Sequence, residues 1–177
     1  METHIGVGVG KYIEKEFANA KESLWIACPT LTISITKKIL SIAKKGIKVR
    51  IITSPRITPE SEESNVLIRK FLLSENNKKL SQIQVEHKVV SNKEVPMIHV
   101  KLYLIDGKIA ILGSPNLGEN HFWKYAEYIW ILNESESVKI AMQDFETLWS
   151  HYNDSGIGLS ETSRKFKNMI RNSRRKF

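Results

Sequence analysis

The sequence predicts an α/β domain built on a mixed β-sheet with helices on its faces. In the first half of the chain, segments with apolar residues at helical spacing alternate with short apolar runs. In the second half, short apolar runs follow one another before a last helical segment. This order is typical of a mixed sheet covered by helices. The 177 residues, 41% of them hydrophobic and 26% charged, suffice for one folded domain.

The predicted elements of the first half alternate between helix and strand. Apolar residues recur at helical spacing from Val9 to Leu24, which predicts a helix, and residues 24–28 form a buried strand that Pro29 ends. A second helix is predicted over 33–45, because lysines fill its last turn and Gly46 stands at its C-cap position. Residues 47–53 are predicted as a strand.

Loops and strands dominate the second half. Residues 55–64 and 91–96 are predicted as loops, although Pro59 can open a third helix. Strands are predicted over 82–90, 97–105, 108–112 and 126–132, and a final helix over 134–151. The pair Asp106-Gly107 is a strong signal for a tight turn between two of these strands.

Several classes of protein are disfavoured by composition and spacing. No apolar run is long enough for a membrane span, and the N-terminal residues do not resemble a signal peptide. The single cysteine, Cys28, fits a reducing compartment, so we expect the cytoplasm. The glycines from Gly6 to Gly10 do not follow a predicted strand, which argues against dinucleotide binding. The histidines do not have zinc-ligand spacing, and we expect no metal or other cofactor.

One constellation of residues points to chemistry. His99 and Lys101 stand two apart on a predicted strand, so both side chains are expected on one face of the sheet. Asp106 ends that strand, and a hairpin then leads to the loop Gly113-Ser114-Pro115-Asn116. Glu127 begins the next strand.

This pattern, H-x-K-x4-D followed by G-S-x-N and a downstream acid, resembles the signature of the phospholipase D superfamily. The predicted helices and strands of the front half resemble the opening of that family more loosely. The resemblance implies a phospholipase D-like catalytic domain over 1–160 that cleaves phosphodiesters without a metal. It leaves 161–177 outside as a basic tail or helix.

The family site implies a role for each residue. A phosphodiester is an anion, so fixed donors at its oxygens are the largest available help. Lys101 would supply a charge and Asn116 an amide donor, while Ser114 would either add a hydroxyl or only shape the loop. His99 would attack phosphorus to give a phosphohistidine, with Glu127 accepting the other ring N–H to fix the tautomer.

Two positions are less typical. Asp106 is grouped with the candidate catalytic residues, but we interpret it as a supporting or turn-forming residue rather than a proton carrier. Tyr125 stands where the family often has an asparagine, two residues before the acid. A second donor is therefore missing there or replaced by a phenol.

The leaving oxygen needs a proton that His99 cannot supply while bonded to phosphorus. Family members use a second histidine from a second H-x-K motif, and this chain has one such motif. We therefore predict a homodimer in which the partner's His99 is the general acid, because a twofold axis brings identical residues together. The four other histidines lack the lysine at the second following position: His4, His87, His121 and His151.

The C-terminal segment concentrates positive charge. Seven basic residues and one acidic residue lie from Glu161 to Phe177, and the whole chain has a net charge of +8. This tail suits a polyanion, and the alternatives are a solubilising, frayed terminus and a plain closing helix packed on the domain. Candidate substrate-binding residues are Lys101, Ser114 and Asn116 with Arg164, Lys165, Lys167, Arg171, Arg174 and Arg175.

The leading functional prediction is an endonuclease that cleaves DNA or RNA. The alternative is a phospholipase or lipid phosphodiesterase at an anionic membrane surface, since Phe166, Met169, Ile170 and Phe177 give the tail an amphipathic pattern. A third possibility is a nucleic-acid-binding module without turnover. The presence of His99, Lys101, Asn116 and Glu127 together argues against the last, because binding alone needs no oriented imidazole.

Overall fold

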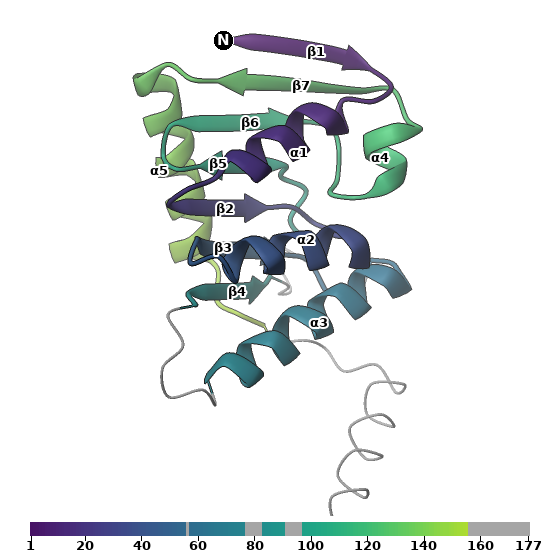
Figure 1. Ribbon diagram of the computed structural model, residues 1–177, viewed down its shortest axis with the longest axis vertical. Helices are drawn as coiled ribbons and strands as arrows, with labels where there is room; N and C mark the ends of the chain where they lie inside the picture. The colour runs from purple at the N-terminus through teal and green to yellow at the C-terminus, as the bar shows by residue number, and fades with distance from the viewer. Residues whose placement is uncertain (56, 77–82, 91–96, 156–177) are drawn as a thin grey trace, which may run out of the picture.

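Seven strands form one mixed β-sheet with the order β1-β7-β6-β5-β2-β3-β4, which confirms the predicted fold class (Figure 1). The structure, a computed structural model, describes residues 1–55, 57–76, 83–90 and 97–155. Three neighbouring strands run parallel, namely β2 (Ser23–Ala27), β3 (Lys48–Thr53) and β4 (Val85–Val89). The other four pair antiparallel: β5 (Leu102–Ile105), β6 (Ile109–Gly113), β7 (Glu127–Leu132) and β1 (Glu2–Gly6).

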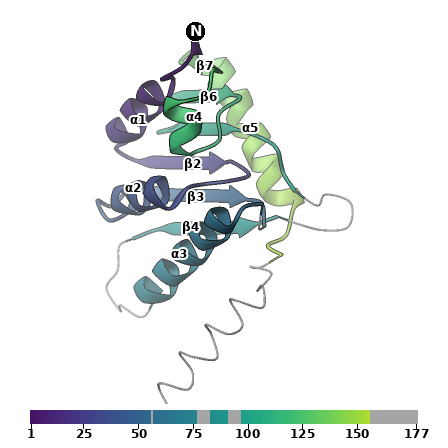
Figure 2. The ribbon, with the colours of Figure 1, turned by 90° about the vertical axis from the view of Figure 1, so that its right-hand side faces the viewer.

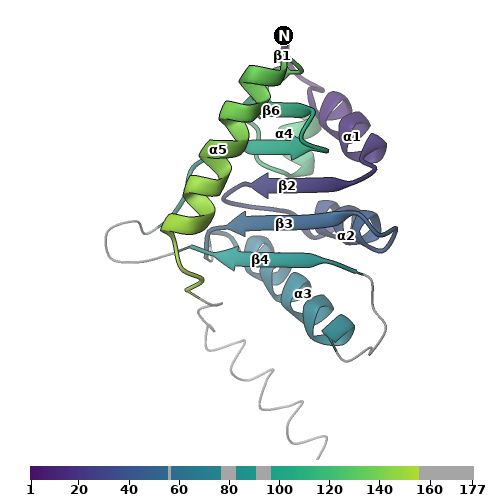
Figure 3. The ribbon, with the colours of Figure 1, turned by 90° about the vertical axis from the view of Figure 1, so that its left-hand side faces the viewer.

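Helices cover the two faces of the sheet unequally. One face carries three helices side by side, α1 (Gly10–Asn19), α2 (Ile33–Ala43) and α3 (Pro59–Asn76) (Figure 2). The opposite face carries α5 (Ser135–His151), which crosses β5 and β6 (Figure 3). A five-residue helix, α4 (Glu119–Trp123), packs against α1 at the end of the sheet. Among the described residues, no helix combines the length and the apolar character that a membrane span requires.

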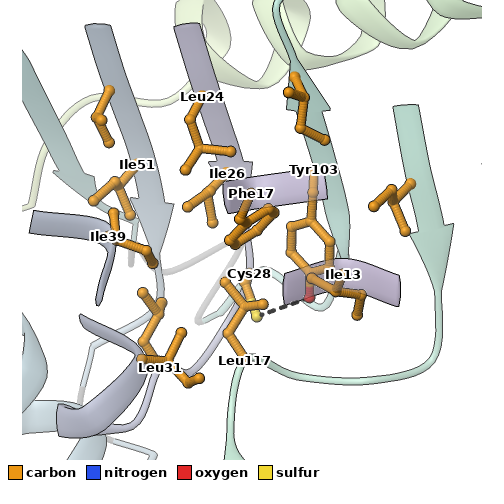
Figure 4. Packing of buried hydrophobic residues seen from close by; sticks show 14 of the residues in the cluster. Ile13, Phe17, Leu24, Ile26, Cys28, Leu31, Ile39, Ile51, Tyr103 and Leu117 are labelled. Atoms are coloured by element: carbon orange, nitrogen blue, oxygen red, sulfur yellow. Dashed lines mark hydrogen bonds between the residues drawn. The ribbon is translucent and has the colours of Figure 1, made fainter. Parts of the chain in front are cut away.

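Alternation along β2 builds a core on each face. Leu24 and Ile26 point into the larger core beneath α1, α2 and α3, where they pack with Phe17 and Tyr103 (Figure 4). Ala27 points to the other face and packs in the cluster beneath α5 with Phe145. Both faces of the central strand are therefore buried, and for this reason the strand reads as a continuous apolar run.

Local signals explain where two elements begin. Asp106 has φ 55° and Gly107 has φ 61°, which confirms the tight turn between β5 and β6, since aspartate and glycine tolerate the left-handed region. At the start of α3, Pro59 occupies the first turn and Thr58 Oγ1 accepts a hydrogen bond from the Ser61 backbone N–H at 3.1 Å. This cap satisfies one of the free amides of the helix end.

The structure corrects several expected boundaries. The first helix ends at Asn19, and Leu24 belongs to β2. The strand expected over 97–105 begins only at Leu102, so His99 and Lys101 precede β5 instead of lying on it. Part of the loop expected over 55–64 is the first turns of α3. Neither β1 nor α4 was expected, because both are five residues long and owe their stability to β7 and α1.

Candidate active site

Four strand ends meet at one edge of the sheet. Cys28 follows β2, and Lys101 precedes β5, which pairs antiparallel with β2 through Ala27 and Leu102. Ser114 follows β6, and Glu127 begins β7. The alternation of strand directions therefore brings residues separated by up to a hundred positions to the same edge.

His99 and Lys101 contact each other although neither lies on a strand. The Lys101 Nζ atom is 3.1 Å from each ring nitrogen of His99 and 3.1 Å from the His99 carbonyl oxygen. An ammonium N–H can bond only a ring nitrogen that keeps its lone pair. The ammonium and the imidazole lie close enough together to contact one phosphate group.

Lys101 is a largely buried cation. Burial lowers the pKa of Lys101 below its ordinary value, and the carboxylate of Glu127 is among the groups that oppose that shift. A cation in such a place stabilises a nearby anion more strongly than one in water, because the surrounding dielectric is low. Lys101 is thus suited to hold a phosphate oxygen.

The loop after β6 is fixed by close packing. A Cβ atom added to Gly113 would lie 2.1 Å from the backbone oxygen of Tyr128, so only glycine allows β6 and β7 to approach this closely. The buried hydroxyl of Tyr103 donates a hydrogen bond to the Pro115 carbonyl at 2.7 Å. Tyr103 also contacts the Cys28 sulfur at 3.6 Å, beneath the loop (Figure 4). The core thereby sets the position of Asn116.

Ser114 is occupied with holding the loop. Its hydroxyl donates to Glu127 Oε2 and accepts the Tyr128 backbone N–H at 3.0 Å. Of the two roles left open for Ser114, these contacts are those of a residue that shapes the loop.

Glu127 contacts a histidine other than the expected one. Its Oε1 atom is 2.6 Å from Nδ1 of His121, and its Oε2 atom accepts from Ser114. The described contacts of Glu127 do not include His99. The partner that the structure gives Glu127 is thus His121, where the sequence led us to expect His99. The helix α4 carries His121, and the ring of His121 lies beside Glu127 at the start of β7.

The sequence alone predicts no role for His121, because this histidine lacks the following lysine of an H-x-K motif. Its Nε2 atom lies 3.2 Å from Nδ2 of Asn116, and Tyr125 packs edge-on at 5.3 Å between ring centroids. The one available signal was a histidine between the G-S-x-N loop and the downstream acid. Tyr125, at the position of the family asparagine, packs against His121.

Asp106 does not join this cluster. It lies at the other end of β5, where its carboxylate accepts the backbone N–H groups of Lys21, Glu22 and Ser23 at 3.0, 2.8 and 2.8 Å. Partial burial by itself would raise the pKa of Asp106. The hydrogen bonds from these backbone N–H groups and the charge of Lys108 lower the pKa by more, so that it falls below its ordinary value. Asp106 is a supporting residue that ties the hairpin turn to the start of β2.

A pocket of about 390 Å³ opens beside the cluster, with Asn116, His121 and Tyr125 in its wall. Thr30 and Thr58 also line this pocket. The remaining candidate binding residues, from Arg164 to Arg175, lie outside the described residues.

Comparison with known proteins identifies the family. Residues 13–149 match the family described as "Cardiolipin synthase, PLD-like domain". The chain is 26% identical over 110 residues to a mitochondrial cardiolipin hydrolase of Canis lupus familiaris, covering 62% of this chain and 38% of that protein. It spans only 30% to 38% of the length of the first curated relatives.

Solved structures share the fold. Nuc from Salmonella typhimurium, a phospholipase D family member, has a TM-score of 0.68 at 19% identity and covers 86% of this chain and 97% of its own. TrmBL2, an archaeal chromatin protein with a novel mode of DNA binding, has a TM-score of 0.60 at 10% identity and covers 86% and 53%. With most of its length matched by the family, the chain belongs to the phospholipase D-like domain family.

Proposed function

We propose that the chain is a metal-independent phosphodiesterase, specifically an endonuclease, that acts through a phosphohistidine on His99. The observation that supports this most is the contact of His99 with the buried cation Lys101, at the edge where Asn116 and Glu127 also lie. A nucleophile beside fixed donors is what attack on an anionic phosphodiester requires.

The first step forms a bond between a ring nitrogen of His99 and phosphorus while the bond to the leaving oxygen breaks. Lys101 and Asn116 would hold the phosphoryl oxygens, which gain charge in the transition state. We propose that two subunits associate about a twofold axis and that the partner's His99 protonates the leaving oxygen. The buried free thiol of Cys28 fits the reducing cytoplasm in which we expect the protein to act.

Nucleic acid is the preferred substrate because of charge. The chain has a sequence pI of about 9.5, and the basic tail over 161–177 suits a phosphate backbone. The similarity to a chromatin protein adds support for nucleic acid. The similarity to a cardiolipin hydrolase supports the alternative, a lipid phosphodiesterase, and keeps it as the second candidate.

A panel of labelled substrates tests this proposal. Single- and double-stranded DNA, RNA and cardiolipin-containing vesicles are incubated with excess chelator, beside the His99→Asn variant. We expect the intact protein to shorten a nucleic acid and His99→Asn to be inactive with an unchanged melting temperature. Hydrolysis of vesicles alone would favour the lipid alternative, and binding without turnover would favour the binding module. Loss of activity on chelation that magnesium restores would contradict the mechanism.

Mixed dimers test the shared site. Wild-type subunits are mixed with excess His99→Asn subunits, and the activity per wild-type subunit is measured beside sedimentation at the same concentration. If the partner's His99 is the acid, this activity should fall as wild-type subunits enter mixed dimers. A fully active monomer would refute the proposal.

Removal of 161–177 tests the tail. Its basic residues would neutralise phosphates and release counterions, so the truncated chain should bind nucleic acid more weakly and with a shallower salt dependence. An unchanged slope of log affinity against log salt would assign the tail to packing or to lipid.

A further inference from the structure

The segment that carries His99 is held by a side chain from another strand end. Residues 98–101 precede β5 and form no ladder with any strand among the described residues. Ser54 directly follows β3, and its Oγ atom accepts the Ile98 backbone N–H at 2.9 Å and donates to the Ile98 carbonyl at 3.1 Å. A hydroxyl can do both at once, because it has one hydrogen and two lone pairs. One side chain therefore satisfies both backbone polar groups of the residue before His99.

These two hydrogen bonds fix the backbone on one side of His99. The Ile98 carbonyl belongs to the planar peptide unit that ends at the Cα atom of His99. On the other side, the carbonyl of His99 accepts a hydrogen bond from Lys101 Nζ at 3.1 Å. Because the peptide unit on each side is held, the Cα–Cβ bond of His99 keeps one direction. The ring can then move only by rotation about the side-chain bonds.

Ser54 is itself fixed on every side. It is fully buried, and its backbone N–H donates to the Pro29 carbonyl at 3.1 Å. Its carbonyl accepts the side-chain amide of Asn65 at 2.9 Å, and Asn65 Oδ1 accepts the hydroxyl of Thr53 at 2.8 Å. Asn65 is a buried residue of α3. The position of Ser54 is therefore set by β3, by α3 and by the loop after β2.

From this geometry we infer that Ser54 is a positioning residue for His99, whose hydroxyl orients the imidazole for attack on phosphorus. The inference rests on the proposed function and adds a residue to it. Ser54 is too deeply buried to touch a substrate, so it acts only through the backbone of Ile98. A displacement of about 1 Å at a reacting group can cost about 10²-fold in rate. The contribution of Ser54 should therefore appear in kcat.

Replacing Ser54 in the intact chain tests the inference. Ser54→Ala removes both hydrogen bonds and leaves the N–H and carbonyl of Ile98 unpaired inside the protein. With bis(p-nitrophenyl) phosphate as substrate, at a temperature where all variants are folded, we expect kcat to fall by about 10–10²-fold. KM should change little, because Lys101 and Asn116, which we propose to hold the phosphate, keep their side chains. A loss that appears only in KM would contradict a positioning role.

A second variant, Ser54→Cys, separates hydrogen bonding from packing. A thiol fills the space of the hydroxyl, but it is a weak donor and a weak acceptor. We therefore expect a kcat between those of wild type and Ser54→Ala. Full recovery of kcat in Ser54→Cys would assign the loss to packing and overturn the inference. If Ser54→Ala does not fold, the same comparison of Ser54→Cys with wild type provides the test.

The matched control is Ser64→Ala. Ser64 is also fully buried, on α3, but its hydroxyl has no hydrogen-bond partner among the described residues. The substitution therefore removes the same atom without releasing the backbone near His99, and we expect the kcat and KM of wild type. An equal fall of kcat in the two alanine variants would show a general effect of buried hydroxyl loss and overturn the inference.

NMR observes the ring of His99 without turnover. In a chain with isotope-labelled histidine, the ring signals of His99 are those that disappear in His99→Asn. They should shift in Ser54→Ala and stay in place in Ser64→Ala. Unshifted signals or a wild-type kcat in Ser54→Ala would overturn the inference while His99 kept its assignment. Absence of turnover of every substrate by wild type, or full activity of His99→Asn, would instead overturn the proposed function.

Discussion

The two ends of the β5–β6 hairpin differ although one short motif spans them. At one end, His99 and Lys101 touch each other beside the loop that holds Asn116. At the other end, Asp106 forms the turn and binds three backbone N–H groups before β2. The first end presents polar groups beside a pocket, and the second satisfies its polar groups within the fold.

This difference shows that residues of one sequence motif need not lie together in one site. The spacing H-x-K-x4-D places its aspartate a full strand away from its lysine, since β5 occupies Leu102–Ile105 between them. Asp106 supports the site indirectly, because it anchors the strand that pairs with β5. Variants at the two ends should therefore separate activity from stability.

The largest effect is expected at the site end. Lys101→Met keeps most of the buried side-chain volume and removes the cation, so kcat should fall by about 10²–10³-fold, as for the loss of one donor to a transition-state oxyanion. The melting temperature should stay within a few degrees of wild type. Turnover of the labelled substrate at saturation measures this. A wild-type kcat would remove Lys101 from the site.

The turn end should show the reverse. Asp106→Asn tolerates the positive φ but removes the charge that binds the backbone amides, so the free energy of unfolding should fall by about 1–2 kcal/mol. The kcat of the folded fraction should be unchanged. Urea denaturation and turnover are measured on the same samples. A lower kcat with an unchanged free energy of unfolding would assign Asp106 to catalysis and contradict the difference between the two ends of the hairpin.

The same pair of proteins gives a pH test. The folded-state pKa of Asp106 lies below its ordinary value, so the carboxylate stabilises the fold above the unfolded-state pKa of about 3.9. This stabilisation disappears as the pH falls through the folded-state pKa. The difference in unfolding free energy between wild type and Asp106→Asn should therefore be constant from pH 5 to 7 and shrink in acid.

His87, a buried histidine away from both ends of the β5–β6 hairpin, gives a further test of stability without an effect on activity. His87 on β4 bonds Thr53 Oγ1 at 2.8 Å, and burial, with the charge of Arg69 adding to it, lowers its pKa from 6.5 to about 3. The unfolded chain binds the extra proton between these values, so stability should fall as the pH drops from 6.5 toward 3. One such group contributes a slope of about 1.4 kcal/mol per pH unit.

Replacing His87 tests this slope. In urea denaturation between pH 4 and 7, His87→Gln should flatten the pH dependence of unfolding relative to wild type, while the exposed His151→Gln should not. Activity at pH 7 should be retained by the folded fraction of both variants. Parallel pH profiles for wild type and His87→Gln would show that His87 is not buried as a neutral ring.

The sequence by itself determined those features of this protein whose formation depends on residues close by along the chain. The central strands, the helices on both faces, the turn at Asp106-Gly107 and the H-x-K pattern follow from apolar periodicity and residue spacing. The edge strand β1 and the short helix α4 gave no such signal, because their stability comes from partners far along the chain.

Tertiary structure alone decided which polar groups meet. The partners of Asp106 lie 83 to 85 positions away, and strand pairing brings them within reach. Glu127 contacts His121 rather than His99 because α4 folds back over the start of β7. Residue types and spacing therefore indicated the chemistry that we propose for this chain. The choice among its histidines required the three-dimensional packing, since hydrogen bonds depend on distances that the sequence order does not specify.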